Sequence, residues 1–270
     1  TLTVMRTLPY GQNGTIDPFI MLDHFGPKHV KPGQGIGVNP HPHRGFEPVT
    51  FLFEGHVEHR DSLGNTGRLD SGGIQWMTSG SGIIHAEDMC KNYTGEGGIL
   101  HGVQLWVNLP RRHKMTDPGY QNITKESMPV VETEEGKIRV TIAAGEIFGK
   151  KGPAKTFTPI TALMIRMEPG QSLEIPLPVH HNAFFQLLSG RVIVNGRPIH
   201  GSHLIRFNND GRLAFLSSDP MADGPTEILL LAGEPINEPV YQYGPFVMSS
   251  RAEIEAAYRD YQEGKMGHLE

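Results

Sequence analysis

Two short segments of this chain each place a pair of metal-ligand side chains two residues apart, and this spacing constrains the fold more than any other feature. The first segment contains His41 and His43, and the second contains His85 and Glu87. In a β-strand, residues i and i+2 project from the same face. On neighbouring strands, opposed Cβ atoms lie roughly 4.5–5.5 Å apart. The spacing therefore predicts two facing strands whose side chains close on one central ion.

The ligand types restrict the metal. Three imidazoles and one carboxylate suit Fe, Mn, Co, Ni, Cu or Zn, whereas Mg or Ca would favour oxygen ligands alone. Four protein ligands on an octahedral ion leave two positions open for a bidentate substrate, or for substrate and dioxygen, which favours a catalytic centre. The alternative is a set of unrelated surface histidines, because the chain contains 14 of them in 270 residues. Two paired spacings of ligand types weigh against that alternative.

Composition and charge exclude several classes of protein. The net charge is −5 with both signs interspersed, so the basic footprint of a nucleic-acid or membrane-surface protein is missing. No apolar run approaches the roughly 18 residues of a membrane span, and we expect no signal peptide. The single cysteine, Cys90, fits a reducing compartment, and we interpret it as an inert apolar residue. We expect a cytoplasmic monomer that contacts neither DNA nor a membrane directly.

Short β-forming runs separated by turn clusters recur along the chain and predict an antiparallel sandwich or barrel in each half. In the first half, the expected strands are 19–22, 49–53, 57–60, 74–78, 83–87 and 102–109. In the second half, they are 138–143, 161–167, 173–176, 183–188, 191–194, 213–216 and 227–231.

Three further patterns organise the chain. Asn195-Gly196 predicts a tight hairpin. Residues 250–263 predict an amphipathic helix that ends at Gly264. The polar passage 111–135 is expected to be a linker, which divides the chain into domains at 1–130 and 131–270, with the helix in the second domain.

Several motifs together resemble the pirin family, a group of two-cupin proteins in the cupin superfamily. They are 41–47 (HPHRGFE), 75–78 (QWMT), 82–87 (GIIHAE), 101–109 (HGVQLWVNL), 232–235 (AGEP) and 244–248 (GPFVM). The resemblance implies an all-β fold of two tandem cupin domains, each a jelly-roll-like double-stranded β-helix, with a short C-terminal helix. It also implies Fe(II), or another divalent transition metal, in the N-terminal cupin. The implied ligands are His41, His43, His85 and Glu87.

The sequence departs from the general cupin pattern in two places. In many cupins the acid after His-x-His, here Glu47, is the fourth ligand, and strand parity would put Glu47 on the same face as His43. Glu47 is therefore a rival of Glu87 or a partner behind the ligands. In the second half, His180 and His181 are adjacent and would point to opposite faces, so we interpret that domain as metal-free.

The resemblance implies two alternative functions. One is a metal-dependent dioxygenase of the quercetin 2,3-dioxygenase type, in which a metal-bound flavonol hydroxyl loses its proton, dioxygen adds and carbon monoxide leaves. Glu87 would then be a catalytic residue that accepts this proton. The other is a non-enzymatic, iron-binding, redox-responsive protein that modulates a protein partner such as a transcription regulator. A deaminase is excluded, because its His-x-Glu motif also needs Pro-Cys-x-x-Cys.

Other residues near the motifs have less defined roles. Gln75, Met77 and Phe53 are candidates for the pocket wall, with core packing as the competing interpretation for Met77 and Phe53. His101 either orients a ligand or packs in the core. Trp76 and Trp106 fit a core role better than a site role.

Overall fold

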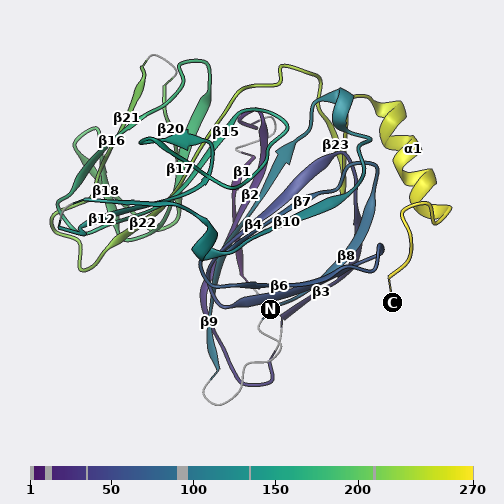
Figure 1. Ribbon diagram of the computed structural model, residues 1–270, viewed down its shortest axis with the longest axis horizontal. Helices are drawn as coiled ribbons and strands as arrows, with labels where there is room; N and C mark the ends of the chain where they lie inside the picture. The colour runs from purple at the N-terminus through teal and green to yellow at the C-terminus, as the bar shows by residue number, and fades with distance from the viewer. Residues whose placement is uncertain are drawn as a thin grey trace. The chain divides into compact units, whose positions relative to one another are not determined.

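The computed structural model describes residues 3–9, 14–34, 36–89, 97–133, 135–208 and 211–269, so the interpretation of Cys90 lies outside the described residues. The chain forms two compact units (Figure 1). The first unit contains Thr1–Pro9, Pro18–Lys125 and Ile236–Glu270, and the second contains Tyr10–Asp17 and Glu126–Pro235. No helix in the described part of the chain is both long and apolar enough to span a lipid bilayer.

The first unit is built from two antiparallel sheets with a shared core. In spatial order, the larger sheet consists of β1 (Val4–Leu8), β2 (Phe19–Val30), β9 (Gly98–Asn108), β4 (Phe46–Glu54), β7 (Ile74–Thr78) and β10 (Gly119–Ile123). The smaller sheet consists of β3 (Ile36–His43), β8 (Ile83–Met89), β5 (His56–Asp61) and β6 (Thr66–Asp70). Phe25, Leu52 and Leu100 of the larger sheet pack against Val57 and Met89 of the smaller one.

The second unit repeats this architecture with its own core. Its main sheet consists of β11 (Val130–Glu132), β12 (Ile138–Ala144), β15 (Ile160–Met167), β22 (Thr226–Gly233), β17 (Asn182–Ser189) and β20 (His203–Arg206). Three two-stranded sheets complete it: β13 (Glu146–Ile147) with β14 (Lys150–Lys151), β16 (Ser172–Pro176) with β21 (Leu213–Ser217), and β18 (Arg191–Val194) with β19 (Arg197–His200). Apolar side chains such as Ile165, Leu187 and Leu230 form the core.

The predicted hairpin and helix are confirmed. Asn195 and Gly196 join β18 to β19 with φ values of 50° and 75°, which is the left-handed geometry of a tight two-residue turn. The helix α1 (Arg251–Gln262) begins after Ser250, whose hydroxyl accepts a hydrogen bond from the Glu253 backbone N–H at 3.3 Å. Its buried face presents Ile254 and Ala257.

The contacts divide the chain differently from the sequence prediction. The passage 111–135 is not a free linker: it forms two 3₁₀ helices (Arg111–His113 and Lys125–Ser127), and its β10 pairs with β7 of the first unit. The C-terminal segment also joins the first unit, where β23 (Tyr241–Tyr243), β24 (Phe246–Met248) and α1 follow one another. The physical reason is an apolar cluster of Ile84, Phe246, Met248, Ile254, Ala257 and Met266.

Candidate metal centre

Three of the four predicted ligands come together in the first unit. β3 and β8 are antiparallel neighbours in which His41 pairs with His85. One ring nitrogen from each of His41, His43 and His85 lies within 4.8 Å of the others. Ring centroids are 4.3 Å apart for His41 and His85, and 5.0 Å apart for His43 and His85. The two i/i+2 spacings predicted this grouping of the three histidines, but they also predicted Glu87, which the group does not include.

A bulge in β3 fixes the orientation of the His41 ring. The register of β3 against β8 shifts by one residue between Val38 and His41, so β3 contains a bulge there. The bulge turns the backbone carbonyl of Asn39 toward the His41 ring, whose Nδ1 lies 2.8 Å from that oxygen. Because Nδ1 must donate in this bond, His41 Nε2 keeps its lone pair for a metal ion.

The electrostatics of the three histidines fit a metal cation. Burial, followed by the neighbouring imidazole of His41, lowers the pKa of His43 to about 3, and the carbonyl of Pro245 offsets part of this shift. Burial and the other imidazoles also hold the pKa of His85 well below its usual value. Both ring nitrogens of His85 are buried without a hydrogen-bond partner among the described residues. Neutral, unsatisfied imidazoles are the form that binds transition metals.

Glu87 is near this cluster in the fold but is not part of it. It follows His85 on the same face of β8, and it pairs with Val38 of β3 and with His59 of β5. The carboxyl group is completely enclosed, and burial raises its pKa to about 7. The structure therefore brings together the three imidazoles and leaves the carboxylate outside the cluster.

Glu47 is not placed where strand parity predicted. β3 ends at His43, and Gly45, with φ of 86°, turns the chain into β4 of the other sheet. Phe46 packs on the His43 ring at 5.1 Å, so Glu47, the next residue, points to the opposite face of β4. There its carboxylate accepts a hydrogen bond from Thr78 Oγ1 at 2.8 Å. The parity argument failed because the strand does not continue through Gly45.

Gln75, a candidate for the pocket wall, contacts polar side chains that the sequence argument did not assign, and one of them, His59, pairs with Glu87 across β5 and β8. The Gln75 amide contacts His59 Nδ1, and Gln75 Nε2 also donates to Asn122 Oδ1 at 3.4 Å. The ring of Tyr120 stacks on His59 with centroids 4.6 Å apart. His59 lies in the strand predicted at 57–60, so its position on a strand could be read from the sequence. No local sequence pattern distinguished Asn122 or Tyr120.

Of the remaining candidates, only Trp106 contacts the histidine cluster among the described residues. His101 bonds to His24 through their Nε2 atoms at 2.9 Å, and Phe53 packs on the His101 ring at 5.3 Å, so neither joins the histidine cluster. Trp106 is buried, as expected, but its ring also contacts His43 at 5.4 Å. In the second unit, no described group of three ligand side chains comes together around His180 and His181.

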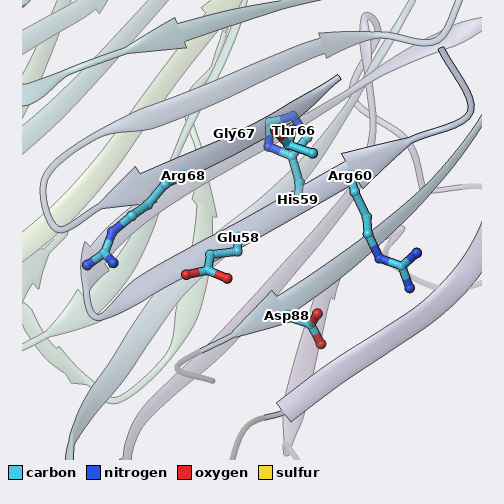
Figure 2. A pocket seen from close by; sticks show the side chains of 7 residues that line it. All are labelled: Glu58, His59, Arg60, Thr66, Gly67, Arg68 and Asp88. Atoms are coloured by element: carbon cyan, nitrogen blue, oxygen red, sulfur yellow. The ribbon is translucent and has the colours of Figure 1, made fainter. Parts of the chain in front are cut away.

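A hollow of about 430 Å³ lies on the smaller sheet but is not the metal centre (Figure 2). Glu58 and Arg60 of β5 extend into it, with Arg68 of β6 and Asp88 of β8 (Figure 2). Glu58 and Arg60 alternate with His59 on β5, and Asp88 follows Glu87 on β8, so these three side chains occupy the outer face of the sheet. Arg68 pairs with Glu58 and shares that face.

Comparison with known proteins agrees with the fold. The chain matches the family model for Pirin over residues 1–107 and that for the Pirin C-terminal cupin domain over residues 162–267. The fold and site thus define a two-cupin protein, as the sequence predicted. The chain belongs to the pirin family. Human pirin is 35% identical over 269 residues, which cover 98% of this chain and 88% of the human protein.

Two solved structures extend this comparison. Quercetin 2,3-dioxygenase from Acinetobacter baumannii has a TM-score of 0.92 and 36% identity, and the match covers 99% of this chain and 92% of that chain. A bacterial pirin from Escherichia coli, solved in complex with nickel(II), has a TM-score of 0.65 and 20% identity, over 87% of this chain and 92% of its own. The second likeness concerns the fold alone.

Proposed function

We propose that this protein is a metal-dependent dioxygenase of the quercetin 2,3-dioxygenase type. The observation that carries the proposal is the cluster of His41, His43 and His85, in which one ring nitrogen of each lies within 4.8 Å of the others and burial favours the neutral imidazole. The likeness to the Acinetobacter baumannii quercetin 2,3-dioxygenase supports a flavonol and dioxygen as the substrates. Quercetin is thus the first substrate to test.

The three histidines would hold the ion, with Glu87 as the fourth ligand. Glu87 shares a face of β8 with His85, so a change of its side-chain rotamer is the adjustment that coordination requires. We propose Fe(II) as the metal, while the nickel(II) complex of the Escherichia coli relative supports testing other divalent ions. When bound, the ion would acidify a coordinated hydroxyl and supply the chemistry that dioxygen needs.

The surrounding residues have roles of their own in this proposal. The buried rings of Phe46 and Trp106 contact each other at 4.2 Å beside His43, and they would exclude water and contact an aromatic substrate. A Glu87 carboxylate oxygen would accept the proton that leaves the flavonol hydroxyl. Both oxygen atoms of dioxygen would enter the cleaved ring product, and one ring carbon would leave as carbon monoxide.

The test is aerobic quercetin consumption and carbon monoxide release by protein reconstituted anaerobically with Fe(II). We expect turnover by the unaltered protein and its loss in His85→Ala, because that variant removes a central ligand. His180→Ala is the matched control, since His180 belongs to the second unit and should be dispensable. Fully metallated protein that neither consumes quercetin nor releases carbon monoxide would contradict the proposal.

A further inference from the structure

The C-terminal segment approaches both strands that carry the histidines. A Cβ atom on Gly45, two residues after His43, would lie 2.0 Å from the Val247 carbonyl oxygen. A Cβ atom on Gly82, three residues before His85, would lie 2.8 Å from the Met266 side chain. Both glycines have positive φ and leave no room for a Cβ atom, so the end of the antiparallel β3–β8 pair where they lie is shaped to receive this segment.

Arg44 connects the same parts through polar contacts. Its Nε donates to the Ser81 carbonyl at 2.7 Å, in the turn that leads into β8. Its Nη1 donates to Asp260 of α1 at 2.8 Å, and its own carbonyl accepts from the Val247 N–H at 3.0 Å. The residue that follows His43 is therefore bonded to the other ligand-bearing segment and to the C-terminal segment.

Lys114 occupies the centre of this junction. Only 2% of the residue is exposed, and its ammonium group donates to three uncharged oxygens: Gly45 O at 2.8 Å, Asn108 Oδ1 at 2.7 Å and Val247 O at 3.0 Å. These oxygens belong to three separate segments of the chain. Burying an ammonium group is costly unless all its donors are used, as they are here.

An apolar side chain would fill the same volume without that cost, but it could not hold three carbonyl-type oxygens at fixed positions. One of these oxygens, Gly45 O, belongs to the turn that follows His43. Pro245 interacts with His43 through its backbone and precedes β24, whose Val247 carbonyl Lys114 also binds. We propose that Lys114 is a positioning residue of the metal centre, which fixes His43 by holding the Gly45 turn against the C-terminal segment. The inference rests on the proposed histidine metal site.

The test is titration of metal-free protein with Co(II), whose visible absorption reports both affinity and ligand geometry. We expect Lys114→Met to weaken Co(II) binding by about 10- to 100-fold and to alter the spectrum, as loss of a residue that supports a ligand does. Lys114→Gln, a milder change that keeps a donor, should weaken binding by a smaller factor. Leu230→Ala, in the core of the second unit, is the control for a general loss of stability and should bind Co(II) normally.

The outcomes separate a positioning role from a structural one. Lower stability of either Lys114 variant with unchanged Co(II) affinity and spectrum would overturn the proposal, as would failure of the unaltered protein to bind Co(II). If Lys114→Met does not fold, Lys114→Gln decides by the same criterion. The Co(II) titration uses no quercetin, so it does not depend on turnover. Absence of quercetin turnover would contradict the dioxygenase proposal but not the positioning role of Lys114.

Discussion

Glu87 and Glu47 are both buried carboxyl groups whose pKa is raised to about 7, chiefly by burial, yet their surroundings differ. Glu47 accepts a hydrogen bond from Thr78 on the face of β4 turned away from the histidines, whereas Glu87 shares a strand face with His85. Similar burial therefore does not imply a similar role. Direction relative to the cluster distinguishes the two residues.

This difference predicts that replacing glutamate with glutamine weakens metal binding at position 87 but not at position 47. Glu87→Gln should lower the affinity for Fe(II) or Co(II) by at least about 10-fold, because an amide is a weaker ligand than a carboxylate. Glu47→Gln should leave the affinity within about threefold, because a glutamine oxygen can still accept from Thr78. Competition with a chromophoric chelator measures both. Metal loss in Glu47→Gln alone would reverse the assignment.

At the residue scale, the histidine cluster could be predicted and the burial of Lys114 could not. Two i/i+2 pairs of ligand types carry the β period in the sequence itself, so His41, His43 and His85 were identifiable. Lys114 lies in a polar passage, where a lysine ordinarily means a solvated surface. Two of the three oxygens that it binds, from Gly45 and Val247, come from distant parts of the chain, and no local pattern encodes such a convergence.

At the element scale, strands were predicted well in their interiors and less well where they turn. β7 matches the predicted residues 74–78, and the Asn195-Gly196 hairpin forms as predicted, because both depend on neighbouring residues. Gly45 instead separates His43 from Glu47, and the parity argument did not anticipate that break. The turn requires a positive φ and close approach to Val247, and the latter is a tertiary contact.

The histidine pair between β2 and β9 makes stability depend on pH. Burial lowers the pKa of His24 and of His101 to about 4. Between pH 6.5 and 4 the unfolded chain therefore binds more protons than the folded one, so acidification costs stability. We expect the pair to account for a loss on the order of 2 kcal/mol over this range, after allowance for partial solvent access.

The measurement is the free energy of unfolding of metal-free protein from pH 7 to pH 4. The double variant His24→Gln, His101→Gln should show a shallower decline than the unaltered protein, because it lacks both titrating groups. Leu100→Ala, in the core of the same unit, should be less stable at every pH but keep the original slope. Identical slopes in the double variant and the unaltered protein would refute the prediction.

At the scale of the whole molecule, sequence order and structural grouping disagree. The repeated β pattern showed that two units exist, but it assigned everything after residue 130 to the second. In the structure, residues 236–270 return to the first unit, where α1 and β24 pack against Ile84. The apolar face of α1 predicted that the helix packs against one of the two units, but an amphipathic pattern does not identify which unit that is.

This grouping predicts which unit responds to a change in α1. Ile254 is buried beside Ile84, which precedes His85 of the histidine cluster on β8. Ile254→Ala should lower the local unfolding free energy by about 2–4 kcal/mol, because it creates a cavity. Amide hydrogen exchange should then become faster in β8, while exchange in β22 of the second unit stays unchanged. Leu230→Ala, the matched control, should speed exchange in β22 and leave β8 unchanged. If Ile254→Ala instead made exchange faster in β22 and left β8 protected, the C-terminal segment would have to be assigned to the second unit.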